Sequence, residues 1–191
     1  MTQTHRGPLP RSAVVATVLA LAACRPATGG RGGPAAAPGT RAPPGGPTTT
    51  AAVETNAVID HVVDGDTVDV RIDGHTERVR LIGINTPETK DPRRPVECYG
   101  PEASALTTLL LPAGTGVRLE RDVEARDDYG RLLAYMRRSD GLFVNLELAR
   151  QGAAVVLSIR PNTAFAAVIA AAADEARRGG RGLWGACPPS R

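Results

Sequence analysis

Hydrophobic and polar residues alternate with a period of two from residue 57 onward, which predicts three consecutive strands. In the segment TVDVRI every second side chain is expected to face inward, and Asp73-Gly74 is typical of a two-residue hairpin turn. We therefore expect a three-stranded meander. Its parts are apolar positions within 57–63, the turn Asp64-Gly65-Asp66, a strand over 67–72 and a strand over 77–84.

The second half of the domain adds helices to further strands. Residues 101–111 predict a helix, because proline lies near its first turn and again just after its end. Residues 117–123 and 132–137 fit two more strands, and 142–151 and 164–178 predict two helices that end at glycines. Five strands and three helices favour an α+β fold, a five-stranded OB-type β-barrel with three α-helices. A five-stranded sandwich is the alternative that element order leaves open.

The first 55 residues do not continue this pattern. Arg6 and Arg11 precede an apolar run over 13–23, which is typical of a secretory signal and too short to span a bilayer as a mature helix. Leu21-Ala22-Ala23-Cys24 resembles the lipobox of bacterial lipoproteins, in which the signal is removed before an acylated Cys. We therefore predict a signal peptide over 1–23 and export, with lipidated Cys24 anchoring the protein on the outer face of the bacterial cell membrane. A simple signal peptide and a secreted protein are the alternative.

The remaining boundaries follow from composition. Residues 24–55 are rich in Pro, Gly, Ala and Thr and have no periodic apolar face, so we expect a disordered tether. We expect the folded domain over 56–187, a short tail over 188–191, and a monomer.

The three cysteines bear on the compartment. If Cys24 carries lipid, Cys98 and Cys187 remain as a pair, and an oxidising compartment favours a disulfide between them. Two free thiols are the alternative. Because no Cys-x-x-Cys pair occurs and the histidines are scattered, a zinc site is not expected.

Net charge does not identify a partner. The chain carries +3, but residues 1–54 hold five Arg and one Glu, so the remainder carries −1. Any case for nucleic acid must therefore come from local placement of charge.

Single polar residues in the domain have ordinary explanations. Arg80 interrupts an apolar strand, which requires an anion or a water-filled cleft unless the side chain points outward. Asp64 and Asp66 can hold a hard cation, but an exposed turn also explains them. Thr86-Pro87-Glu88 is also typical of a helix start. Taken one at a time, these signals are not specific.

Together these residues resemble the staphylococcal nuclease (thermonuclease) family, from about Asn56 to Trp184. Order and spacing match at six places. They are Asp64-Gly65-Asp66-Thr67-Val68, Arg80-Leu81, Asn85-Thr86-Pro87-Glu88-Thr89, Tyr99-Gly100-Pro101-Glu102-Ala103-Ser104-Ala105, Asp128-Tyr129-Gly130-Arg131-Leu132-Leu133-Ala134-Tyr135, and Val144-Asn145 with Arg150-Gln151-Gly152. The resemblance implies the same OB barrel with three helices.

The resemblance also implies roles for single residues. Arg80 and Arg131 match guanidiniums that hold the scissile phosphate, and Glu88 matches the carboxylate that orients or deprotonates the attacking water. Tyr129 matches a phosphate-contacting tyrosine. The matched ligands of a calcium ion (Ca²⁺) are Asp66, Asn85 and the carbonyl of Thr86. The implied activity is calcium-dependent endonucleolytic hydrolysis of DNA or RNA that leaves 3′-phosphate ends; the alternative is a non-catalytic nucleic-acid-binding lipoprotein of the cell envelope.

The chain departs from the best-known family member in ways that change expectations. Asn85 replaces an Asp, which removes one negative charge and is expected to weaken calcium binding. Leu157 and Ile159 replace two tyrosines, and losing base stacking of roughly 1–3 kcal/mol per base predicts weaker nucleotide binding. Asp128 replaces a lysine.

Overall fold

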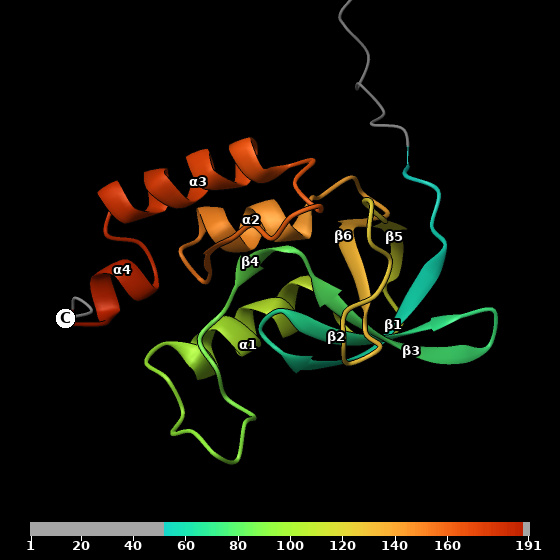
Figure 1. The fold of residues 1–191 in the computed structure, drawn as a ribbon, viewed down its shortest axis with the longest axis horizontal. Coiled ribbons are helices and arrows are strands. Elements are labelled where there is room, and N and C mark those ends of the chain that lie inside the picture. Colours follow the sequence, from blue (N-terminus) through green and yellow to red (C-terminus); the bar gives the residue numbers. More distant parts are fainter. Residues whose placement is uncertain (1–51, 189–191) are drawn as a thin grey trace, which may run out of the picture. The chain divides into compact units, whose positions relative to one another are not determined.

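Five strands close into a barrel in the computed structural model, which describes residues 52–188 (Figure 1). Around the barrel the order is β1-β2-β3-β6-β5, and only the β3–β6 pair is parallel. This closure confirms the predicted OB-type barrel and excludes the sandwich. The strands are β1 (Ala57–Asp64), β2 (Thr67–Ile72), β3 (His75–Leu81), β5 (Gly116–Glu120) and β6 (Leu132–Arg138).

The predicted signal peptide, the lipidation site Cys24, the tether as far as residue 51, and residues 189–191 lie outside the described residues. The last part of the predicted tether is described. There the Val53 amide donates to the Ser139 carbonyl at 2.9 Å, so contacts with the domain begin shortly before residue 56. In residues 52–188 no helix combines the length and apolarity needed to cross a bilayer.

The predicted alternation in β2 is right for the inward-facing residues but wrong for Asp69. Val68 and Val70 are fully buried inside the barrel, as expected from a period of two. Asp69, which alternation assigns to the outside, is also buried, with 6% of its surface exposed. The Arg78 guanidinium on β3 covers it through two hydrogen bonds of 2.8 and 2.9 Å.

The predicted third strand over 77–84 is in fact two elements. β3 ends at Leu81, and the chain turns at Gly83, whose φ of +84° is unfavourable for any residue with a side chain. The continuation β4 (Gly83–Asn85) leaves the barrel and pairs with β7 (Val155–Leu157), a strand that the sequence did not predict. This turn aims Asn85 and the following residues away from the barrel core.

Three helices lie at the predicted places, with slightly different ends. The first two pack against strands of the barrel, and the third packs on the second. A fourth, short helix follows them, and the core extends from the barrel interior to the faces of α2 and α3. Tyr135, Phe143 and Phe165 meet edge to face there, with ring centroids 4.7–6.1 Å apart. The helices are α1 (Gly100–Leu110), α2 (Val144–Arg150), α3 (Ala166–Arg178) and α4 (Leu183–Ala186).

One buried polar residue joins α2 to the point where β3 passes into β4. Asn145 is completely buried; its Oδ1 accepts from the Met136 amide at 2.9 Å, and its Nδ2 donates to the Ile82 carbonyl at 2.9 Å. These bonds fix the main chain at the exit of the barrel and so support the segment that carries Asn85.

The two domain cysteines form a disulfide. Cys98 and Cys187 are bonded, with their Cα atoms 5.9 Å apart. The predicted pairing is confirmed, and the alternative of two free thiols is wrong. The bond joins two residues 89 positions apart in the sequence, one just before α1 and one just after α4. The expected stabilisation from loop entropy is about 4–5 kcal/mol.

Candidate active site

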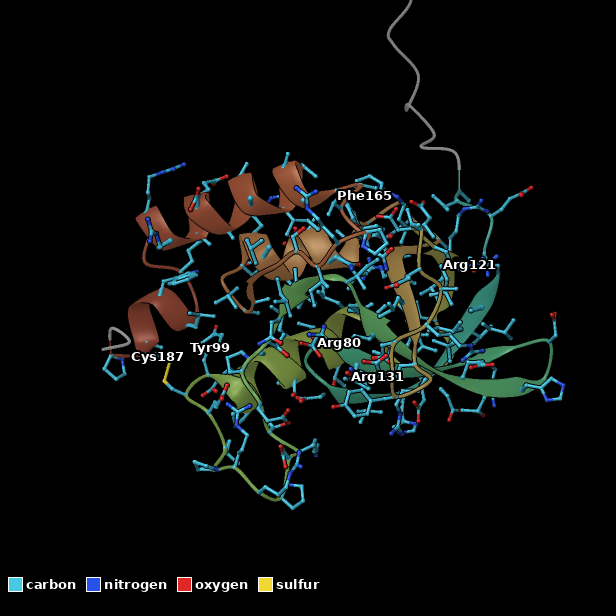
Figure 2. All side chains as sticks on the ribbon, in the orientation of Figure 1. Arg80, Tyr99, Arg121, Arg131, Phe165 and Cys187 are labelled. Atoms are coloured by element: carbon cyan, nitrogen blue, oxygen red, sulfur yellow. A yellow bond between two sulfur atoms is a disulfide. The ribbon has the colours of Figure 1, made fainter. Side chains whose placement is uncertain are left out.

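A cleft of about 700 Å³ brings together every residue predicted for the site. These residues come from the β1–β2 turn, from β3, from β4 and the loop after it, and from the loop before β6. Figure 2 shows Arg80 and Arg131 near each other in the central part of the domain. The predicted residues in the cleft lining are Asp66, Arg80, Asn85, Thr86, Glu88, Tyr129 and Arg131.

The β1–β2 turn is not an ordinary exposed hairpin. Asp64 and Asp66 are 8% and 6% exposed, and Asp64 Oδ1 accepts from the hydroxyls of Thr89 and Ser104 at 2.8 and 3.0 Å. Gly65 is required because a Cβ there would lie 2.6 Å from Thr86 Oγ1. The explanation by solvated turn carboxylates is therefore wrong, and the turn is held rigidly against α1 and the segment after β4.

Arg80 points into the cleft and not outward. Its Nη2 lies 3.1 Å from Asp66 Oδ2 and donates to Asn85 Oδ1 at 3.0 Å. Its Nη1 donates to the carbonyls of Leu81 and Ile84 at 2.7 and 3.1 Å. The side chain is 12% exposed, so these partners replace the lost water and fix the plane of the guanidinium.

Burial has the largest effect on the pKa values of both Asp66 and Arg80. It raises the pKa of the Asp66 carboxyl, although Arg80 and the Thr86 amide act in the opposite direction. Burial also lowers the pKa of Arg80, with Asp66 opposing the shift and the positive charge of Arg131 adding to it. The two guanidiniums are close enough to perturb each other, and the carboxylates of Asp64, Asp66 and Asp127 lie around them. The N–H groups that these acids leave free are the donors available to an anion.

Arg131 is held by a neighbouring acid that the sequence analysis did not single out. Asp127 accepts from the Arg131 amide at 2.9 Å and from Arg131 Nε at 2.7 Å. Burial alone would raise the pKa of Asp127, but the bonds from Arg131 leave the pKa lowered overall, so the carboxylate stays ionised. The Arg131 Cζ lies 5.4 Å from the ring centroid of Tyr129, whose side chain lies at the exposed rim of the cleft.

Glu88 closes the turn that follows β4. Its Oε1 accepts from the amides of Thr89, Lys90 and Asp91 at 2.9, 2.6 and 3.1 Å. Among the described residues, hydrogen bonds reach only this oxygen of the carboxylate. A carboxylate fixed through one oxygen can direct the other toward a water molecule in the cleft.

Oxygen atoms around Arg80 suit a hard divalent cation. Asp66 Oδ2 and Asn85 Oδ1 already converge on one positive group, and the buried Thr86 Oγ1 beside them has no hydrogen-bond partner among residues 52–188. The Thr86 carbonyl accepts from Asn85 Nδ2 at 3.3 Å, which places it next to these oxygens. Residues 52–188 contain no cluster of three His, Cys, Asp or Glu side chains that could hold a metal ion. Of the three predicted ligands, only Asp66 has such a side chain, since the other two are an amide oxygen and a main-chain carbonyl. All-oxygen sets of this kind are the ones calcium prefers, so the residues fit the ion.

The family model for staphylococcal nuclease homologues matches residues 78–186, which include the second half of β3, both arginines and the segment with Glu88. The chain belongs to the staphylococcal nuclease family. It is 42% identical over 127 residues to the thermonuclease of Staphylococcus intermedius, which is 66% of this chain and 74% of that protein. It is 41% identical over 123 residues to the thermonuclease of Staphylococcus hyicus, which is 64% of this chain and 72% of that protein.

A Bacillus relative extends the comparison beyond the thermonucleases. Endonuclease YncB of Bacillus subtilis (strain 168) is 40% identical over 112 residues, which is 58% of this chain and 52% of that protein. Membership of the staphylococcal nuclease family thus agrees with the barrel and with the content of the cleft.

Besides Asn85, the structure also places the other three departures from the best-known family member. Leu157 and Ile159 line the cleft and are 39% and 63% exposed, so an apolar surface without aromatic rings lies in the same cleft as Arg80 and Arg131. Asp128 lines the cleft beside Tyr129. The sequence analysis gave no role to Asp127, because the i,i+4 pairing rule applies to helices and this segment is a loop.

Proposed function

We propose that this domain is a calcium-dependent endonuclease that hydrolyses phosphodiester bonds of DNA or RNA and leaves 3′-phosphate ends. One observation supports the proposal above all. Two buried or half-buried arginines, a group of oxygen donors suited to a cation and a hydrogen-bonded glutamate line the same cleft. Phosphodiester hydrolysis requires these three elements around a single phosphate.

Substrate binding begins with the arginines. Arg131, fixed by Asp127, presents its remaining N–H groups to phosphate oxygens at the cleft mouth, and Arg80 reaches the same space from the cleft floor. Tyr129 at the rim is positioned to donate its hydroxyl to a phosphate oxygen. The Nη groups of Arg131 make no hydrogen bond within residues 52–188, so they can meet two phosphate oxygens at once and orient the phosphorus. The Nη groups of Arg80 already donate to Asn85 and to two carbonyls, so Arg80 contributes its positive charge and its Nε–H.

Asp66, Asn85 and the Thr86 carbonyl would hold the calcium ion. When bound, the ion supplies positive charge that offsets the charge developing on the phosphate oxygens. Because the Asp66 pKa is raised by burial, a cation beside this carboxylate would also favour its ionised form.

Glu88 carries the proton transfer. Its carboxylate accepts a proton from water; the water oxygen then forms a bond to phosphorus, and the bond from phosphorus to the 5′ oxygen breaks. The departing 5′ oxygen takes up a proton, and the phosphate stays on the 3′ side. A general base of this kind contributes about 10²–10⁴ in rate.

A matched pair of substitutions tests the proposal. Glu88→Gln keeps the size of the side chain and removes the base, whereas Glu102→Gln makes the same chemical change on the exposed face of α1. We expect release of acid-soluble nucleotides to depend on calcium, to stop with EDTA, to fall at least 100-fold in Glu88→Gln and to persist in Glu102→Gln. DNA binding without cleavage by the wild-type chain at any calcium concentration would favour the non-catalytic binding module instead.

The expected ends provide an independent check. Products with 3′-phosphates resist extension by a DNA polymerase until a phosphatase has removed the phosphate. Immediate extension would contradict cleavage of the bond to the 5′ oxygen.

We also propose that the enzyme is exported and held on the outer face of the cell membrane by a lipid on Cys24, with a secreted form as the alternative. The support is the sequence pattern before Cys24. Lipid anchoring predicts that Cys24→Ser moves the protein from the membrane fraction to the medium. A wild-type protein already found only in the medium would contradict the anchor.

A further inference from the structure

Glu97 holds the main chain of Glu88 from both sides. Its Oε2 accepts from the Glu88 amide at 3.0 Å, and its own amide donates to the Glu88 carbonyl at 2.9 Å. The other carboxylate oxygen of Glu97 accepts from the Arg94 guanidinium. The residue proposed as the base thus sits in a reciprocal pair of bonds with a residue nine positions later.

The segment between them contributes little packing of its own. Residues 92–96 are all exposed, so the hydrogen bonds between Glu97 and Glu88 are what hold the two ends of the loop together. The next residue, Cys98, is bonded to Cys187 at the end of α4 (Figure 2). The α4 segment is anchored in turn, because the Leu183 amide donates to the Gly152 carbonyl at 2.9 Å.

The start of α1 completes this arrangement. The Gly100 amide donates to the Glu97 carbonyl at 3.0 Å, and a Cβ on Gly100 would lie 3.2 Å from the carbonyl oxygen of Glu88. Residues 97–100 therefore pack directly on the Glu88 main chain. Through Cys98 and Cys187 that contact is tied covalently to the C-terminal helix.

We propose that Glu97 is a positioning residue for Glu88 and that the Cys98–Cys187 bond keeps Glu97 in place. The role rests on the proposed nuclease function, and it is distinct from the general stabilisation that any disulfide gives. It predicts an effect on the chemical step. Glu97 lines the same cleft, but within residues 52–188 it makes no hydrogen bond or ion pair with Arg80, Arg131 or Tyr129, so substrate affinity is expected to change little.

Two sets of variants isolate the role, all made in the full-length chain carrying Cys24→Ser so that no third thiol interferes. Cys98→Ser/Cys187→Ser removes the bond, and Glu97→Ala removes the carboxylate. Both are expected to lower kcat by roughly 10- to 100-fold with KM within about twofold, as a misplaced catalytic group does. Glu97→Gln keeps an oxygen that accepts from the Glu88 amide, and it is expected to restore most of kcat although it loses the same charge as Glu97→Ala.

Two controls separate positioning from stability. Val117→Ala weakens the barrel core at a residue outside the cleft lining, and it is expected to lower the melting temperature without changing kcat at a temperature where every variant is folded. Dithiothreitol reduces the disulfide to two thiols and is itself oxidised to its cyclic disulfide. It is expected to lower the wild-type rate and to leave the double Ser variant unaffected.

Hydrogen exchange provides a readout that needs no catalysis. We expect the Glu88 amide to lose protection in Glu97→Ala and in the disulfide-free variant, while the Leu81 amide in the barrel keeps it. Unchanged kcat and unchanged Glu88 protection in both variants would overturn the positioning role. If the wild type cleaves no nucleic acid, the nuclease proposal fails, and loss of Glu88 protection alone still supports the structural half of this inference.

Discussion

Adding an aromatic ring to the cleft that holds Arg80 and Arg131 should tighten nucleic-acid binding. Leu157 ends β7 opposite Gly83, and Ile159 follows two residues later; both side chains line the cleft and keep 39% and 63% of their surface exposed. Tyrosine at either position therefore has room to present a ring face without displacing core residues. Since the positions are largely exposed, stability is expected to change by no more than about 0.5 kcal/mol.

The magnitude follows from base stacking. One added ring is worth about 1–3 kcal/mol per stacked base, which corresponds to roughly a 5- to 150-fold decrease in Kd. Binding of a fluorescent single-stranded oligonucleotide, measured by anisotropy in a Glu88→Gln background, reports this change without cleavage. In the active enzyme, KM should fall in the same proportion with little change in kcat.

Leu109→Tyr is the matched control, because Leu109 is an exposed leucine, at 74%, on α1 and outside the cleft lining. It adds the same ring where no base is expected. If Leu157→Tyr and Ile159→Tyr improved binding no more than Leu109→Tyr does, the assignment of this apolar surface to the bases would be refuted.

Three further substitutions test other parts of the structure. Asn85→Asp adds a negative charge to the cation site, so the calcium concentration for half-maximal rate should fall on the order of tenfold, and an unchanged titration would remove Asn85 from the ligand set. Hydrogen bonds from Arg78 lower the pKa of Asp69 below 3.8, so this pair contributes stability that is complete above pH 3.8 and is lost as pH falls further. Urea unfolding of Asp69→Asn should show lower stability at neutral pH and a flatter dependence on pH below 4 than the wild type; parallel curves would contradict the pairing. Asn145→Ala leaves the Met136 amide and the Ile82 carbonyl unpaired in the core, so unfolding should require about 2–5 kcal/mol less free energy, and a loss under 1 kcal/mol would contradict the bridge.

Periodic patterns were enough to predict the main strands and helices, whereas the choice of a barrel over a sandwich came from the family resemblance. The strands over 57–72 and the helix over 101–111 rest on local alternation and on proline placement, which act over neighbouring residues. The β4–β7 pair was missed because three-residue strands are too short for a period, and their partners lie far apart in the sequence. The burial of Asp69 was not predicted for a related reason. Its burial depends on Arg78 from the adjacent strand, which alternation does not describe.

The sequence predicted which residues make up the candidate site but not how their side chains are arranged. Motif spacing named Asp66, Arg80, Glu88 and Arg131, and all four line one cleft. That Arg80 points inward, which the strand pattern left undecided, follows from the turn at Gly83, because the chain beyond it supplies acceptors to the guanidinium. The supporting bonds to Glu88 and Arg131 come from acids whose positions along the chain gave no sign of their partners.

The central claim is that Arg80 and Arg131 act on a single phosphate, and a double-mutant cycle tests it most directly. Arg80→Lys and Arg131→Lys keep the charge and remove the planar fork, and Arg71→Lys, on an exposed part of β2, is the control. With saturating calcium we predict that each single variant lowers the single-turnover cleavage rate on the order of 10²-fold, and that the double variant loses far less than the product of the two. Wild-type rates in either single variant, or losses that multiply as for independent sites, would contradict the account.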